Sequence, residues 1–209
     1  MAASQAFWDN IAQKYADTPV RNPGAYDETI TRIRARLSGD ENVLEAGCGT
    51  GTTALRLAGD VNRILATDIS DKMVAIGERK AADQNIANVE FQRATLETVA
   101  APATSFDVVM TFHLLHLLGD PEAAIEIIHG LLKPGGLYIS KTACLGDGFG
   151  FMRVPIFLMR LVGRAPMVRF LKRDDVERMV SAAGFEILEA DDLPAKPPCR
   201  FVVARKRPA

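Results

Sequence analysis

Residues 45–51 (EAGCGTG) place three glycines between an apolar run and a helix-like run. Glycine has no Cβ atom, so the chain can turn tightly and a ligand can lie against bare backbone beside the free N–H groups of a helix start. Glu45 would repel a pyrophosphate there but could accept hydrogen bonds from an ammonium group. The lysine of a phosphate-binding loop is missing, because Thr52 and Thr53 follow the last glycine. The segment indicates a cationic ligand, or else a strand-to-helix turn that binds nothing.

A second carboxylate, Asp68, ends the next apolar run, at residues 63–68. A carboxylate at this position can accept hydrogen bonds from both hydroxyl groups of a nucleoside ribose. Its alternative role is to cap the following helix, although Ser70 is better placed to do so. Together with the glycine loop, Asp68 predicts a nucleoside ligand that lacks paired phosphates.

Two histidines, His113 and His116, follow an apolar run at residues 106–112. They are the candidate catalytic residues, because an imidazole can accept a proton near neutral pH. The alternative for both is local hydrogen bonding without chemistry. The third histidine, His129, lies late in the following helical pattern, where the favourable position of a cation near a helix C-terminus explains it sufficiently.

The elements that position these residues alternate between strand and helix. Strand-like runs occur at residues 42–46, 63–68, 89–93, 106–112 and 136–142. Helical patterns separate most of them, at 52–57, at 71–82 and from Asp120 onward. The alternation predicts a parallel sheet covered by helices on both faces. The last two runs, 185–190 and 200–206, are joined by a proline-rich turn without a helix and should form an antiparallel hairpin.

The 209 residues suit a single domain, with a helical cap at 1–38 and an insertion at 145–173. The 25 Lys and Arg nearly balance the 26 Asp and Glu, so we expect a small-molecule partner and no nucleic acid. Cys48, Cys144 and Cys199 lack C-x-x-C spacing, and no metal site is expected. No leader or membrane-spanning pattern is visible, which predicts a cytoplasmic protein. We expect it to be either a monomer or a homodimer.

Several segments together resemble the class I S-adenosylmethionine-dependent methyltransferases, in particular the small-molecule enzymes of ubiquinone and menaquinone biosynthesis. The resemblance rests on VLEAGCGTG (43–51), ATDIS (66–70), FDVVMTFHLLHLLGDPEAAI (106–125) and LLKPGGLYIS (131–140), in the family's order. It implies an α/β, Rossmann-like fold, in which a seven-stranded mixed sheet has the order 3-2-1-4-5-7-6 with strand 7 antiparallel and helices on both faces. It also implies S-adenosyl-L-methionine over the carboxyl ends of strands 1 and 2, in agreement with the general rule for open α/β sheets.

The resemblance assigns roles to single residues. The methionine part of the cofactor would be held by Glu45, Ala46, Gly47, Cys48 and Gly49. Asp68 would bind the ribose, with Ile69 and Met73 on one face of the adenine and Thr111 and Phe112 beside the sulfonium. Tyr15, on the first helix, would contact the cofactor as part of a lid, unless the aromatic face of that helix only packs on the core.

One segment departs from the family's pattern. Relatives usually read Gly-Asp-Ala after strand 3, and the Asp accepts a hydrogen bond from the adenine amino group, but this chain reads Ala94-Thr95-Leu96. Thr95 can still accept one hydrogen bond and the Leu96 backbone can donate one. Glu97 is an alternative acceptor.

Methyl transfer is an in-line displacement, so alignment of the acceptor and exclusion of water carry much of the rate. A general base is needed only where the attacking atom holds a proton of high pKa. No Asn- or Asp-Pro-Pro-Tyr follows Thr111, which disfavours amino groups of adenine or glutamine as acceptors. Two alternatives stay open: a non-catalytic sensor or scaffold that binds the same cofactor, and an NAD(P)-dependent oxidoreductase.

Residues 149–173 are apolar and basic and contain no acidic residue. We expect them to form a lid over a partly hydrophobic acceptor. The alternatives are an amphipathic surface for acidic lipid, a dimer interface, and a plain core helix whose arginines reach the solvent. Pro155, Gly163 and Pro166 should divide the segment into two short helices.

Overall fold

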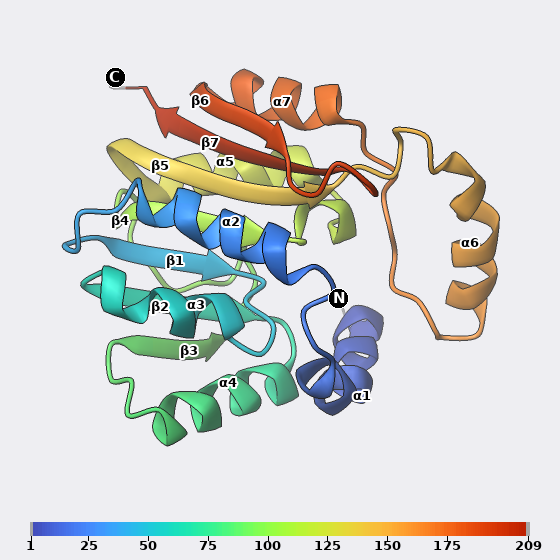
Figure 1. The fold of residues 1–209 in the computed structure, drawn as a ribbon, viewed down its shortest axis with the longest axis horizontal. Coiled ribbons are helices and arrows are strands. Elements are labelled where there is room, and N and C mark those ends of the chain that lie inside the picture. The colour runs from blue at the N-terminus through green and yellow to red at the C-terminus, as the bar shows by residue number, and fades with distance from the viewer. Residues whose placement is uncertain (1, 208–209) are drawn as a thin grey trace.

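Seven strands form one mixed sheet in the computed structural model, which describes residues 2–207. The strands are β1 (Asn42–Ala46), β2 (Arg63–Asp68), β3 (Val89–Arg93), β4 (Phe106–Phe112), β5 (Leu132–Ala143), β6 (Phe185–Asp192) and β7 (Cys199–Lys206). Their order is β3-β2-β1-β4-β5-β7-β6, with β7 antiparallel to both of its neighbours and the other pairs parallel. The predicted fold class is confirmed (Figure 1).

β5 begins earlier than its sequence indicates. The pattern predicts a KPGG turn before a strand at 136–142, whereas the strand already pairs at Leu132. Phe106 of β4 lies opposite Leu132, and Val108 lies opposite Leu137, so the residues between them bulge out of the ladder. Gly135 has a φ of +77°, a left-handed conformation that glycine adopts without strain and that lets the chain rejoin the sheet.

Helices cover both faces of the sheet, because its central strands are apolar on both sides. One face carries α2 (Pro23–Arg34), α3 (Thr52–Leu57) and α4 (Asp71–Asp83), which pack on a cluster that includes Val108 and Met110. The other face carries α5 (Pro121–Leu131) and α7 (Arg173–Ala182), which pack on a cluster that includes Val109 and Tyr138. In Figure 1, α2 lies in front of the sheet and α5 behind it.

Polar side chains cap the N-termini of three helices. Asn22, Ser70 and Asp120 cap α2, α4 and α5, each by accepting a hydrogen bond from a backbone N–H in the first turn. Such caps stabilise a helix by about 1 kcal/mol each. Ser70 therefore takes the capping role and leaves Asp68 for other partners.

Two helices lie outside these layers. α1 (Ala2–Asp17) packs against α4, where Ala12, Met73 and Ile76 form a small buried cluster with the ring of Trp8 beside it. The segment between β5 and α7 forms a turn of 3-10 helix, η3 (Gly150–Met152), and one α-helix, α6 (Arg153–Leu161), which stands away from the body (Figure 1).

The prediction of two short helices in this segment is wrong. Pro155 lies in the first turn of α6, where a helix N–H has no intrahelical acceptor and proline is tolerated. After Leu161 the chain is not helical again until α7 begins at Arg173. Within residues 2–207, no helix has the length and apolar character needed to cross a bilayer.

Candidate active site

The carboxyl ends of three strands meet at one edge of the sheet. Ala46, at the end of β1, is in register with Thr67 of β2 on one side and with Thr111 of β4 on the other. The loops that follow these strands therefore lie side by side. They carry the glycine segment, Asp68 and the two candidate histidines.

The glycine loop has a backbone that other residues would not adopt easily. Gly47 has a φ of +71° and Gly49 a φ of +55°. A Cβ atom at Gly47 would lie 2.9 Å from a methyl group of Leu114, and one at Gly49 would lie 3.5 Å from the ring of Tyr15. Gly51 also has a positive φ, but a Cβ atom there would collide with Phe91 of the core. The first two glycines thus shape the ligand side of the loop, and the third serves packing.

Glu45 is a buried carboxylate with an unused oxygen. Its side chain is 2% exposed, and Oε2 has no hydrogen-bond partner among the described residues. Burial raises its pKa to about 8, although a hydrogen bond from the Ala54 N–H at the start of α3 acts to lower this pKa. An unpaired buried carboxyl is costly, so such a group in a native protein indicates a missing partner. An ammonium group supplies both the charge and the donors that Oε2 lacks.

Asp68 holds the glycine loop in place and keeps capacity for a ligand. One carboxylate oxygen accepts from the Gly49 N–H at 3.0 Å, and the other from the Ser70 N–H at 2.9 Å. Burial nevertheless raises the Asp68 pKa. A carboxylate offers about four acceptor sites, so each oxygen can accept one more hydrogen bond, as a ribose diol would require.

Ala46 and Cys48 can contribute only backbone groups. Both side chains are buried in the core. The Cys48 N–H already donates to the Thr67 carbonyl at 2.9 Å, which ties the loop to β2. Burial raises the pKa of the Cys48 thiol well above its usual value, so the thiol stays protonated and unreactive.

Tyr15 on α1 lies beside the glycine loop, where a Cβ atom at Gly49 would be in contact with its ring. Its side chain remains 51% exposed, and its ring meets Trp8 edge to face. Partial burial raises the Tyr15 pKa, and the nearby carboxylates of Asp68 and Glu45 raise it further. The phenol is therefore a neutral donor close to both acidic groups.

A side chain that sequence reasoning overlooked secures this helix. Asp9 of α1 accepts a hydrogen bond from the Ser70 hydroxyl at 2.6 Å and another from the Lys72 N–H at 3.3 Å. α1 is thereby fixed to the start of α4, directly after Asp68. The only signal in the sequence is an acid beside the apolar stripe of the first helix, which by itself reads as a solvated side chain.

The residues expected around adenine are not all available. Ile69 is partly exposed beside Asp68, whereas Met73 is 2% exposed beneath α1 and offers no surface to a ligand in this arrangement. Thr95 is partly exposed, and its hydroxyl lies 3.2 Å from that of Thr98. The Leu96 side chain is buried in the core, so only its backbone can reach a ligand.

Thr111 and Phe112 end β4 and point to opposite faces of the sheet. The Thr111 side chain is fully buried, and its hydroxyl is within 2.8 Å of the Tyr138 hydroxyl. Phe112 packs against the core on the α2 side. Both therefore offer mainly backbone at the edge where their strand meets β1.

His113 and His116 lie together immediately after β4, with ring centres 6.3 Å apart. His113 has a φ of +55°, an uncommon conformation that is often found at functional sites. Solvent reaches its side chain, but surrounding protein lowers its pKa to about 4, and Lys141 contributes. Burial also lowers the His116 pKa to about 4, and its Nδ1 has no partner among the described residues. Both imidazoles are neutral at pH 7.

His129 lies apart from these two, as expected. It belongs to the last turn of α5 and packs edge to face against Phe185.

Lys141 is a second residue that sequence reasoning missed. It is buried, and its Nζ donates to the Thr29 hydroxyl at 2.8 Å. The sequence signal that could have identified Lys141 is a lysine inside the apolar run of β5.

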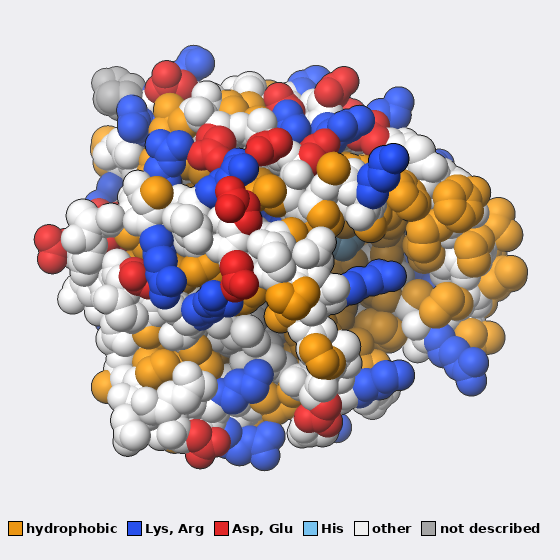
Figure 2. Space-filling model, viewed as in Figure 1, with side chains coloured by type: hydrophobic (Ala, Val, Ile, Leu, Met, Phe, Trp, Pro, Cys, Tyr) orange, Lys and Arg blue, Asp and Glu red, His pale blue; other side chains and the backbone are white. Residues whose placement is uncertain are grey.

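A hollow of about 580 Å³ separates α6 from the segment that returns to α7. Figure 2 shows the surface hollowed between the body and the arm. Apolar side chains and arginines line it together, among them Ile156, Phe157, Phe170, Arg153, Arg160 and Arg169. The Arg169 N–H donates to the His116 carbonyl at 2.7 Å, which joins the hollow to the loop after β4.

Comparison with known proteins places this geometry among methyltransferases. A family model described as a methyltransferase domain matches residues 43–136. The ubiquinone/menaquinone biosynthesis C-methyltransferase UbiE of Azotobacter vinelandii is 31% identical over 201 residues, which cover 85% of this chain and 79% of that protein. A ubiquinone biosynthesis O-methyltransferase of Cereibacter sphaeroides is 26% identical over 181 residues, covering 82% of this chain and 70% of that protein.

Solved structures show the same fold. The [4+2]-cyclase SpnF aligns with a TM-score of 0.77 at 21% identity, covering 92% of this chain and 86% of its own. Geranyl diphosphate C-methyltransferase from Streptomyces coelicolor aligns with a TM-score of 0.73 at 15% identity, covering 89% of this chain and 80% of its own. At these identities the likeness shows the architecture and not the substrate.

Proposed function

The chain belongs to the class I S-adenosylmethionine-dependent methyltransferases, and from this we propose that it methylates a small, partly hydrophobic acceptor beside the carboxyl end of β4. S-adenosyl-L-methionine is its methyl donor, which the relatives support over the nicotinamide-dependent alternative. The observation that carries the proposal is the buried carboxyl group of Glu45, which has an oxygen without a partner among the described residues, next to a bare glycine loop.

The residues present fit this donor. Glu45 Oε2 would accept from the ammonium group, and the Gly47 and Gly49 backbone would border the methionine part. Asp68 would accept from the ribose hydroxyls with its remaining lone pairs. Ile69, Thr95 and the Leu96 backbone are left for adenine, since Met73 is covered by α1.

Bound S-adenosyl-L-methionine supplies a methyl carbon that its positively charged sulfur makes electrophilic. The protein's part is to hold an acceptor atom in line and to exclude water. Tyr15 covers the glycine loop from α1, and the backbone of Thr111 and Phe112 closes the opposite side. His113 is neutral at pH 7 and open to solvent, so its imidazole can take a proton from a hydroxyl acceptor.

The acceptor class follows from the hollow next to the histidines. Its Ile156, Phe157 and Phe170 side chains suit an apolar ring or chain, and its arginines suit an oxygen-rich group. The relatives named for ubiquinone and menaquinone biosynthesis support an acceptor of this kind.

Product formation tests the proposal. The purified protein is incubated with S-adenosyl-L-methionine carrying a deuterated methyl group and with phenols and quinols, with and without a prenyl chain, and products are identified by mass spectrometry. We expect labelled product from the apolar acceptors and none from a polar control such as glycine. Binding of S-adenosylhomocysteine without any product would favour the sensor alternative, and product from glycine alone would refute the acceptor class.

Asp68→Ala should weaken S-adenosylhomocysteine binding, measured by calorimetry, by about 1–3 kcal/mol, because hydrogen bonds to the ribose and to the Gly49 N–H are lost. Asp68→Asn keeps one acceptor oxygen and should lose less. Asp83→Ala, at the exposed end of α4, is the matched control and should bind like the wild type. Unchanged affinity in Asp68→Ala would refute the ribose assignment.

A further inference from the structure

Residues 151–162, which span α6 and the residues on either side of it, present an apolar surface that no part of residues 2–207 covers. Phe151 is 73% exposed, and Val154, Leu158, Leu161 and Val162 are each more than half exposed. Figure 2 shows hydrophobic side chains gathered over this arm. A contiguous apolar patch of this kind marks an interaction surface, because isolated exposed apolar residues are common but clusters are not.

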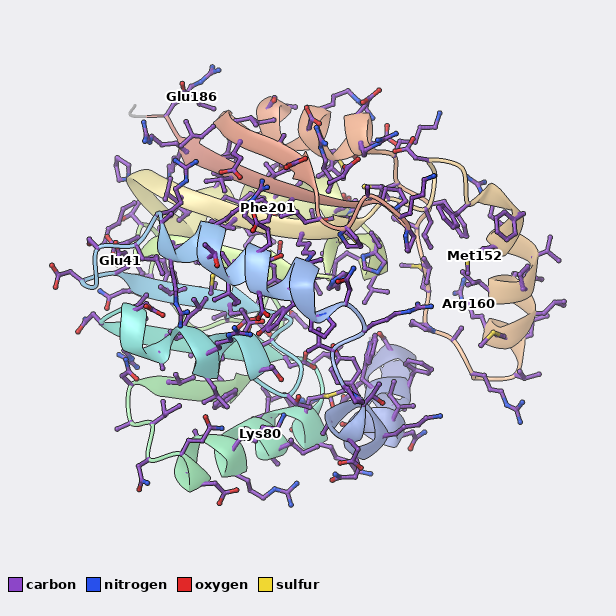
Figure 3. All side chains as sticks on the ribbon, in the orientation of Figure 1. Glu41, Lys80, Met152, Arg160, Glu186 and Phe201 are labelled. Carbon is purple, nitrogen blue, oxygen red and sulfur yellow. The ribbon has the colours of Figure 1, made fainter. Side chains whose placement is uncertain are left out.

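The two faces of α6 have different characters. Arg153 and Arg160 are seven residues apart, so they share a face, and both line the hollow. Figure 3 shows Arg160 on the side of α6 that faces the rest of the molecule. Leu158 and Val162 then lie on the opposite, outward side, which carries no charge. The helix is amphipathic with its apolar face turned to the solvent.

The charges around α6 are all positive. Residues 149–173 contain six basic residues and no acid. Asp147, just before the segment, is already paired with Arg173 at 2.9 Å. Arg160 and Arg164 are in no ion pair with any residue of the described part of the chain. The arm therefore combines uncovered apolar area with uncompensated positive charge.

We propose that α6 docks on a membrane surface rich in anionic lipid. Its nine residues are too few to cross a bilayer, so the helix would lie in the interface, with Phe151, Leu158 and Val162 among the acyl chains. Arg164, which follows the helix and is exposed, would reach the lipid phosphates, and Arg160 on the opposite side of α6 would add positive charge close to the surface. A second copy of this segment carries the same positive charge and no acid, so it would leave these arginines without a partner of opposite charge.

Vesicle flotation tests the proposal with the full chain. Vesicles of phosphatidylcholine alone are compared with vesicles containing one third phosphatidylglycerol, at low and at high salt. We expect wild-type binding to be at least about tenfold tighter to the anionic vesicles and to weaken as salt rises. Leu158→Ser/Val162→Ser should lower that binding by about tenfold or more. Arg160→Gln/Arg164→Gln should remove the preference for anionic lipid.

Matched controls separate docking from misfolding. Val20→Ser removes an exposed apolar side chain elsewhere, and Arg63→Gln/Arg79→Gln removes two exposed charges on the β2–α4 side. Both should bind vesicles like the wild type, and all variants should bind S-adenosylhomocysteine equally. Absence of binding to anionic vesicles, or equal binding by Leu158→Ser/Val162→Ser, would overturn the proposal. So would a wild-type dimer in sedimentation that Leu158→Ser/Val162→Ser converts to a monomer.

Discussion

At the scale of single residues, we expect Glu45 to make cofactor binding depend on pH. Its pKa is raised to about 8, so below that pH the carboxyl is mostly protonated and cannot pair with an ammonium group. The affinity for S-adenosylhomocysteine should therefore rise between pH 6 and pH 8, by at most about tenfold per pH unit. Calorimetry at several pH values measures this. Glu45→Gln should bind more weakly at pH 8 and show a flat profile. A flat wild-type profile would contradict the pairing.

The same residue should affect stability in the opposite direction. Without ligand, the folded state keeps a proton on Glu45 that the unfolded state releases above its ordinary pKa of 4.5. The contribution of Glu45 to stability is then largest below pH 4.5 and is lost as pH rises towards 8, by up to about 1.4 kcal/mol per pH unit. Equilibrium denaturation should show a shallower fall in Glu45→Gln. An equal slope in both proteins would show that this carboxyl is ionised throughout.

The two histidines should differ in their effect on turnover. His113 has a positive φ, so Asn is the suitable replacement, because it tolerates this conformation but cannot act as a base. If His113 takes the acceptor's proton, His113→Asn should lower kcat by about 100-fold or more without changing S-adenosylhomocysteine affinity. His116→Asn should cost less than about tenfold. The pH dependence of wild-type kcat should show no histidine titration near pH 6.5, since the pKa values of both His113 and His116 are lowered to about 4. Full activity of His113→Asn would mean that alignment alone suffices.

At the scale of elements, the contact between α4 and β3 depends on a glycine. A Cβ atom at Gly77 would lie 2.4 Å from Cε1 of the buried Phe91. Gly77→Ala should therefore destabilise the protein by about 1–3 kcal/mol in equilibrium denaturation, although alanine favours a helix. Gly130→Ala is the matched control, because Gly130 also lies in a helix and has open space around it. We expect it to be neutral or to stabilise by up to about 1 kcal/mol. Equal effects of the two substitutions would contradict the packing argument.

At the scale of the whole molecule, stability should be unevenly distributed. The sheet is buried under helices on both sides, whereas the apolar side chains of α6 are largely exposed. Backbone amides of residues 154–162 should exchange hydrogen at least about 100-fold faster than those of β4, because α6 can open without disturbing the core. Mass-spectrometric exchange measures this directly. Addition of anionic vesicles should slow exchange in α6 alone. Protection of α6 equal to that of β4 would contradict an independent arm.

The sequence by itself determined the fold and indicated where to look for a site. The bounds of β1, β2, β3, β4 and α3 match the apolar runs and helical pattern, because strands buried on both faces read as continuous apolar segments. The glycine loop and Asp68 were recognisable, because few side chains suit a positive φ or a strand-end carboxylate. These signals are local, and local chemistry decides them.

Only the tertiary structure decided which side chains can reach a ligand. Met73 looks available in the sequence, but α1 covers it, and Leu96 is buried so that only its backbone is left for a ligand. Asp9 and Lys141 acquire their roles from partners that are distant in sequence, Ser70 and Thr29. The outward apolar face of α6 likewise exists only because nothing else in residues 2–207 packs on it. Burial and long-range hydrogen bonds depend on how the helices and strands pack together, and no short stretch of sequence encodes that packing.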